Sequence, residues 1–180
     1  MEIEKSKERL KQTINLKELL GHSPNDQEAQ EFYDRAIEEI IERTQEGFDR
    51  NGRRFPSYTE QYADFKGVGV NEVDLTLFGD MLLSIRGERQ GDIVNLVIDG
   101  DEAAKAFGHV SGYEGHPTIT NGPKRDFFGI TEGEARTIAQ DVESRPSIPS
   151  IADIFAETTP SIDDVISALG LEIDDWGVDG

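Results

Sequence analysis

The clearest periodic pattern in this chain runs from residue 29 to residue 48, where apolar side chains recur every three or four positions. This spacing places them on one face of an α-helix, with Glu and Arg side chains opposite. Ser23 and Pro24 precede the pattern, and proline suits a first helical position because its missing N–H is not needed there. Asn51 and Gly52 follow it and tolerate the left-handed conformation in which helices end. We therefore predict one long amphipathic helix between these two signals.

The start of the chain shows a weaker pattern of the same kind. Its apolar positions stand among Lys and Glu residues at Ile3, Leu10, Ile14, Leu16, Leu19 and Leu20. This spacing predicts a helix over residues 3–20 that ends near Gly21. Residues 1–22 are thus predicted to be a separate N-terminal helical segment.

Two later runs, Met81–Arg86 and Asp92–Asp99, favour β-strands, the second because most of its apolar residues are β-branched. The turn-like residues 87–91 join them, so we predict an antiparallel hairpin. The second run is apolar on both faces. We expect the long helix to cover one face and a neighbouring subunit to cover the other.

Shorter elements are predicted around this hairpin. Helices are expected at Thr59–Lys66 (a short amphipathic turn or helix), at Glu102–Phe107 and at Glu132–Glu143, and a further strand at Pro117–Thr120. The third helix follows Thr131, whose spacing to Glu134 is that of a capping box. The fold class is therefore α+β, with an antiparallel β-sheet packed against a long amphipathic helix and shorter helices, and with a C-terminal extension.

Two prolines, Pro146 and Pro149, stiffen the chain after the last of these helices and mark a domain boundary. The predicted body spans residues 23–145. Residues 146–180 form an acidic C-terminal arm with short helices, and they carry many apolar side chains, including Phe155 and Trp176. We expect this arm to dock on another surface, because so many apolar groups are costly to leave in water.

The charge of the chain narrows the possible partners. The 180 residues carry a formal net charge of -19, and from Asp141 onward ten Asp and Glu residues stand against Arg145 alone. Binding to the phosphate backbone depends on Lys and Arg, so DNA is not an expected ligand. No run approaches the roughly 18 apolar residues of a membrane span. There are no cysteines, which fits a soluble protein in a reducing compartment.

Residues with potential chemistry are few. His109 and His116 lie seven apart in a glycine-rich stretch near Ser111, a spacing that matches neither a helical metal-ligand pair nor a nucleophile elbow. Gly67 and Gly69 lack the surrounding residues of a phosphate-binding loop. We expect no catalytic site, no metal and no cofactor.

Aromatic and basic residues near turns are better candidates for contact with partners, since Arg and aromatic side chains are enriched at interface hot spots. Phe127 and Phe128 are adjacent, so in an extended strand they would face opposite sides. Both rings are either packed in the core, or one of them serves with Arg125 as a contact anchor. The interface candidates are Arg125, Phe127, Phe128, Tyr113, Phe55, Tyr58, Phe155 and Trp176.

Four short segments follow one another in an order and spacing that resemble the tailed-phage virion morphogenesis family, the tail-completion or neck proteins that join head to tail. The resemblance covers roughly residues 30–142. Its specific motifs are L-T-x-x-G-x-M-x-x-S-I and R-x-F-F-G-I. The segments are residues 55–66, residues 75–85, residues 104–112 and residues 125–130. Where the family usually has Thr-Gly before the methionine, this chain has Phe78 and Gly79.

The resemblance implies a non-enzymatic structural virion protein, found in the host cytoplasm during assembly and then in the neck or at the head-proximal end of the tail. It implies a homo-oligomeric ring, hexameric in form, with a heterologous interface. Its other partners would be neck, connector, tail-tube or tail-terminator proteins, without a membrane. We expect an acidic lumen to let DNA pass with only transient, non-sequence-specific contact.

Two other classes of function remain open. An acidic protein that imitates DNA would inhibit a nucleic-acid-binding protein, and would array its carboxylates at phosphate-like spacing. A small hydrolase would use His109 or His116, and replacing either residue would abolish its activity.

Overall fold

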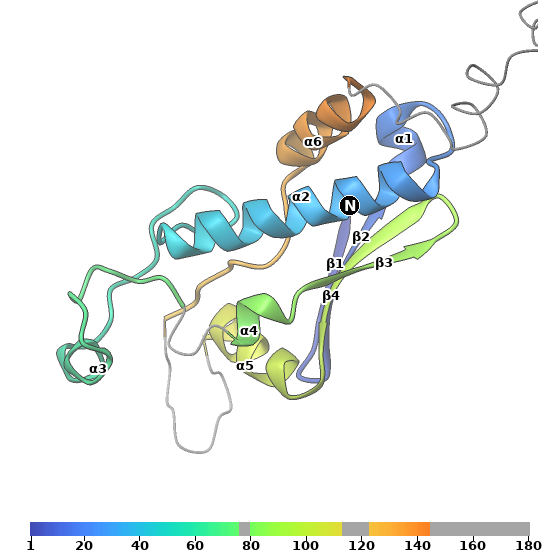
Figure 1. The fold of residues 1–180 in the computed structure, drawn as a ribbon. Helices are drawn as coiled ribbons and strands as arrows, with labels where there is room; N and C mark the ends of the chain where they lie inside the picture. Colours follow the sequence, from blue (N-terminus) through green and yellow to red (C-terminus); the bar gives the residue numbers. More distant parts are fainter. Residues whose placement is uncertain (76–79, 113–122, 145–180) are drawn as a thin grey trace, which may run out of the picture. The chain divides into compact units, whose positions relative to one another are not determined.

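The structure is a computed structural model of the whole chain, and it describes residues 1–75, 80–112 and 123–144 (Figure 1). The chain divides into two units, residues 1–145 and residues 146–180. The second unit lies outside the described residues, and so does the predicted strand at 117–120. The fold described below is that of the first unit.

The centre of the fold is a four-stranded antiparallel sheet with the strand order β1-β2-β4-β3. The strands are β1 (Glu2–Lys5), β2 (Arg9–Asn15), β3 (Arg86–Gln90) and β4 (Ile93–Asp99). Leu10 and Ile14 of β2 pair in register with Ile98 and Val94 of β4, and all four side chains are fully buried. They form the apolar face of the sheet.

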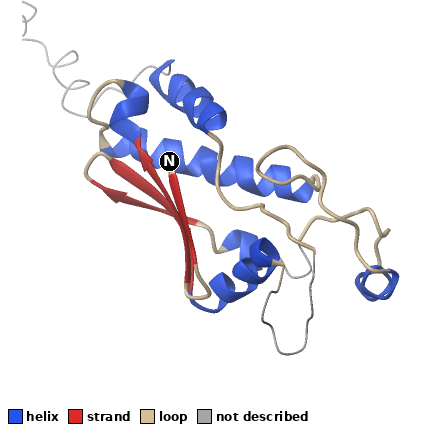
Figure 2. Ribbon diagram, turned by 180° about the vertical axis from the view of Figure 1, so that it is seen from behind, coloured by secondary structure: helices blue, strands red, loops and turns tan. Residues whose placement is uncertain are grey.

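The described part of the chain also contains six helices. They are α1 (Leu16–Leu20), α2 (Asp26–Gln45), α3 (Glu60–Lys66), α4 (Asp80–Leu83), α5 (Gly100–Ser111) and α6 (Glu132–Ser144). The long helix α2 packs across β3 and β4 and buries Phe32, Ala36 and Ile40. Helix α6 packs along α2 and contacts α1, while α5 contacts β2 and β4 (Figure 2). This arrangement confirms the predicted α+β class.

The ends of the helices follow local capping chemistry. Helix α2 begins after Asn25, which forms a capping box with Glu28, and not at Pro24 as predicted. It ends at Gln45, before Asn51 and Gly52. Thr131 and Glu134 form the capping hydrogen bonds predicted for α6. These side chains bond backbone N–H groups that a first helical turn leaves unpaired.

The prediction of a helix over residues 3–20, and of residues 1–22 as a separate helical segment, is wrong. Residues 2–5 and 9–15 are strands of the central sheet, and only Leu16–Leu20 is helical, ending as predicted at Gly21. The side chains of β2 alternate in burial, as strands require. The alternation is hidden in the sequence because Gln12, a polar residue, occupies the buried row between Leu10 and Ile14.

The predicted strand Met81–Arg86 is also wrong. Residues 80–83 form α4, where Met81 and Leu82 are buried while Leu83 is exposed. The strand that pairs with β4 is β3, over the polar residues that we expected to form a turn. Strand β3 lies at the edge of the sheet, where a polar sequence is tolerated because one side needs no partner strand.

The second face of the sheet is polar. Arg9 pairs with Glu88 at 2.7 Å, and Arg86 pairs with Glu88 and Asp99. Val97 is fully buried there although it is not part of the main core, and its register neighbours are Lys11 and Arg86. Long cationic side chains cover apolar surface with their methylene groups. Side chains of the same chain therefore cover Val97, while Ile93 and Asn95 on the same face of β4 remain partly exposed.

Candidate protein-protein interface

The segment of residues 125–131, which contains the R-x-F-F-G-I motif, is bonded into the core from two sides. We call it the strap. Arg43 of α2 donates hydrogen bonds to the carbonyl oxygens of Phe127 (3.1 Å) and Gly129 (2.8 Å). Gln12 of β2 donates to the carbonyl of Ile130 (2.7 Å) and accepts from its N–H (2.8 Å). Buried side chains thus pair backbone groups of the strap that belong to no sheet.

Both aromatic rings of the strap are fully buried. Phe127 and Phe128 lie with their ring centroids 6.5 Å apart in an edge-to-face arrangement. The residues form a bend and not an extended strand, so the two neighbouring side chains do not point to opposite sides. This confirms that both rings are packed in the core, and it removes Phe127 and Phe128 from the interface candidates.

Arg125 ties the strap to a distant loop. Its N–H donates to the carbonyl of His109 at 2.8 Å, and its guanidinium donates to the carbonyl of Pro56 at 3.1 Å and lies 5.3 Å from the ring of Tyr58. Arg125, Phe55 and Tyr58 are all less than a tenth exposed. The structure brings these three candidates together, but as a buried junction and not as surface anchors.

Tyr58 also fastens the segment of residues 57–75. We call this segment the arm; it is distinct from the C-terminal arm of residues 146–180. The Tyr58 hydroxyl accepts from Lys66 at 3.2 Å and from the N–H of Leu75 at 3.3 Å, and Lys66 forms an ion pair with Asp74. Although burial opposes its charge, the hydrogen bonds to Asp74 and Tyr58 raise the pKa of Lys66. The N–H of Tyr58 donates to the carbonyl of Val70 at 2.8 Å. Both ends of the arm are therefore held at one point.

The arm carries α3 away from the sheet, as both views show (Figures 1 and 2). Phe65 of α3 is 73% exposed, and Tyr62 and Val70 are more than a third exposed. Leu83 of α4 is also largely exposed. Large exposed apolar side chains that gather on one segment are typical of protein contact sites. The sequence signal for Phe65 is its place between Asp64 and Lys66 on a helix too short to bury it.

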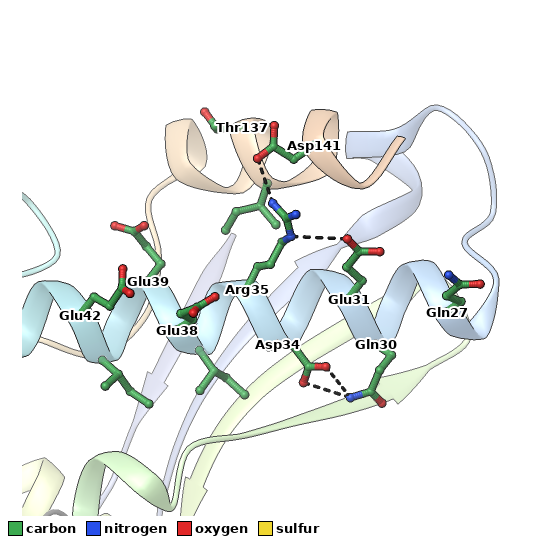
Figure 3. A pocket seen from close by; sticks show the side chains of 13 residues that line it. Gln27, Gln30, Glu31, Asp34, Arg35, Glu38, Glu39, Glu42, Thr137 and Asp141 are labelled. Carbon is green, nitrogen blue, oxygen red and sulfur yellow. Dashed lines mark hydrogen bonds and ion pairs between the residues drawn. The ribbon is translucent and has the colours of Figure 1, made fainter. Parts of the chain in front are cut away.

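A groove of about 1080 Å³ lies between α2 and α6 (Figure 3). Ile37, Ile41 and Ile138 supply its apolar lining. Its carboxylates come from Glu31, Asp34, Glu38, Glu39, Glu42 and Asp141. Arg35 pairs with Glu31 and Asp141. Burial, followed by repulsion from Glu134, raises the pKa of Glu39. The lining of the groove is therefore mainly acidic, with three isoleucines among the carboxylates.

The residues considered for catalysis lie as follows. His109 is in the last turn of α5, where burial, with the charge of Arg125, lowers its pKa to about 4. The hydroxyl of Ser111 donates to the carbonyl of Gly108 at 3.5 Å. His116 lies outside the described residues, as do Tyr113, Phe155 and Trp176.

Residues 1–75, 80–112 and 123–144 contain no group of three or more His, Asp or Glu side chains placed to hold a metal ion. No helix among them has the length and apolar character needed to cross a membrane.

Comparison of this chain with protein-family models, with curated proteins and with solved structures found no match.

Proposed function

We propose that this protein is a structural virion protein of a tailed phage, a ring-forming tail-completion or neck subunit that joins the tail to the DNA-filled head. The observation that carries the proposal is the convergence of separate motif segments on one junction. Arg125 contacts the loop at Pro56 and the carbonyl of His109. These residues come from three of the four segments that carry the resemblance.

The contacts at this junction join motif segments that are far apart in the sequence. The strap and the loop at residues 55–58 form one hydrogen-bonded unit, so these motif segments share one structural task. The unit fixes the base of the arm through Tyr58. A subunit that acts by contact needs such a rigid base, because a pre-organised element loses less entropy when it binds.

The exposed surface supports the same function. The arm presents Phe65 to solvent, and α2 presents an acidic groove. The groove is a concave face for a heterologous contact with the next copy, which closes into a ring when its rotation permits. The arm is a separate apolar projection, left for contact with other virion parts. Carboxylates that face the lumen of such a ring would repel DNA phosphates within about 8 Å at physiological salt.

Deletion of the gene from the phage that carries it tests this proposal. We expect negative-stain microscopy to show DNA-filled heads beside free tails, because the two parts assemble separately without a joining subunit. Supplying the protein from a plasmid should restore joined, infectious particles. Joined and infectious particles in its absence would refute the proposal.

A further inference from the structure

Two arginines at the C-terminal end of α2 lie in a short, rigid turn. The Asp49 carboxylate accepts from the N–H groups of Asn51 (2.8 Å) and Arg53 (2.9 Å), and the N–H of Asp49 donates to the carbonyl of Arg53 (2.8 Å). Arg53 and Arg54 are both exposed. We call residues 49–54 the cationic turn.

Within the described part of the chain neither guanidinium group forms an ion pair, although the protein carries a large excess of acids. Arg54 lies 4.9 Å from the centre of the Phe48 ring, which orients it without neutralising it. The cationic turn is therefore an exposed, positively charged turn on a chain of net charge -19.

The groove between α2 and α6 has the opposite character. Asp34, Glu38 and Glu42 are exposed and stand four residues apart on α2. Like charges at this spacing oppose helix formation, and none of the three forms an ion pair within residues 1–75, 80–112 and 123–144. The partly exposed Ile37 and Ile41 lie among them. The groove thus combines unneutralised carboxylates with apolar surface.

An arginine suits both features, because its methylene stem covers apolar surface while its planar head pairs with carboxylates. In the structure neither arginine of the cationic turn forms an ion pair with the groove carboxylates of its own chain. The N–H of Phe55 donates to the carbonyl of Gly47 at 2.7 Å, and the backbones of Phe48 and Arg54 form an isolated antiparallel β-bridge. The turn is therefore held close to the end of α2. Glu38 lies about two helical turns before that end.

We propose that the cationic turn of one copy docks in the α2–α6 groove of the next copy, with Arg53 and Arg54 over Ile37 and Ile41 and against Glu38 and Glu42. Two different patches of the chain then meet in a heterologous contact, the type that builds rings. The inference rests on the proposed function for its biological setting, but the contact can be tested in purified protein.

Disulfide trapping tests the contact directly, because the chain has no cysteine of its own. The variants Glu38→Cys and Arg54→Cys are purified separately, mixed and oxidised. We expect a covalent dimer of the two unlike chains. The matched control mixes Arg54→Cys with Glu8→Cys, an exposed acid in the β1–β2 turn. Equal yields from both mixtures would overturn the proposal.

Charge reversal provides a second, independent measurement. The double variants Glu38→Arg/Glu42→Arg and Arg53→Glu/Arg54→Glu should each weaken self-association by about tenfold or more in sedimentation velocity, as loss of partly exposed ion pairs predicts. Mixing the two should restore association, because the wild-type turn of the first variant fits the wild-type groove of the second, and the reversed turn fits the reversed groove. Variants that associate like the wild type would refute the contact.

The two proposals fail in different ways. If particles need the protein for head-to-tail joining but the cysteine pair gives no trapping above control, the contact is wrong and the structural role stands. If trapping succeeds but particles join without the protein, the contact stands and the head-to-tail role is wrong.

Discussion

Gln12 shows how much of this core depends on one polar side chain. Its amide exchanges two hydrogen bonds with the backbone of Ile130, at 2.7 and 2.8 Å, and it is 1% exposed. Leucine in its place would leave a buried N–H and a buried carbonyl without partners. We expect Gln12→Leu to lower the free energy of unfolding by about 2–4 kcal/mol.

Urea denaturation measures this loss. Thr13→Val is the matched control, because Thr13 is the next residue of β2 but bonds Asn95 on the polar face. The control should cost less than about 1 kcal/mol. If both substitutions cost the same, Gln12 does not hold the strap.

His109 predicts a dependence of stability on pH. Burial, with the charge of Arg125, lowers its pKa from 6.5 to about 4. The unfolded chain therefore takes up a proton below about pH 6.5 that the folded chain refuses until about pH 4, so stability falls as the pH drops through this window.

From about pH 7.5 to about pH 5, the free energy of unfolding should fall by up to about 2 kcal/mol more in the wild type than in His109→Gln. Urea titrations of both proteins at both pH values give this difference. His22 is present in both, so its titration cancels. Equal losses would show that the His109 ring is not held neutral by the fold.

At the scale of elements, the crossing of α2 over β3 depends on the absence of a side chain. A Cβ atom at Gly87 would lie 2.2 Å from the ring of Tyr33. Because that ring carbon is close to the Tyr33 backbone, the helix or the strand has to shift to admit a methyl group. We expect Gly87→Ala to destabilise the protein by about 1–3 kcal/mol.

Thermal and urea denaturation measure this effect against Gly133→Ala. Gly133 lies in the first turn of α6, and a Cβ atom there would have nothing closer than 3.9 Å. Alanine favours the helix, so this control should raise stability by about 0.5–1 kcal/mol. A Gly87→Ala protein as stable as the wild type would mean that the crossing is looser than described.

At the scale of the whole molecule, the arm separates stability from function. Phe65 is 73% exposed, so Phe65→Ser should change the free energy of unfolding by less than about 0.5 kcal/mol. If the arm makes the contact that joins virion parts, the same variant should restore few joined particles when it complements a gene deletion.

Particle counts by negative-stain microscopy measure this effect. Gln61→Ser, an exposed position on the same helix, should complement like the wild type. Full complementation by Phe65→Ser would exclude Phe65 as a contact residue, without affecting the roles assigned to the buried junction.

The sequence alone determined the elements whose signals are local. Strand β4, helix α3 and helix α6 lie within a few residues of their predicted positions, because β-branched runs, the Thr59 cap and the Thr131 capping box act on neighbouring residues. The apolar face of α2 was predictable for the same reason. The α+β class follows from the order of these elements.

Only the tertiary structure decided where polar side chains are buried. Gln12, Arg43 and Arg125 look like surface residues in the sequence, yet each is buried because a distant backbone segment accepts its hydrogen bonds. A buried polar group is stable only with such a partner, and no local pattern shows whether one exists. For this reason the sequence predicted a helix where the N-terminal strands lie, and predicted surface anchors at Arg125, Phe55 and Tyr58, which are buried. Phe65, which is exposed on α3, is the contact candidate that the structure adds.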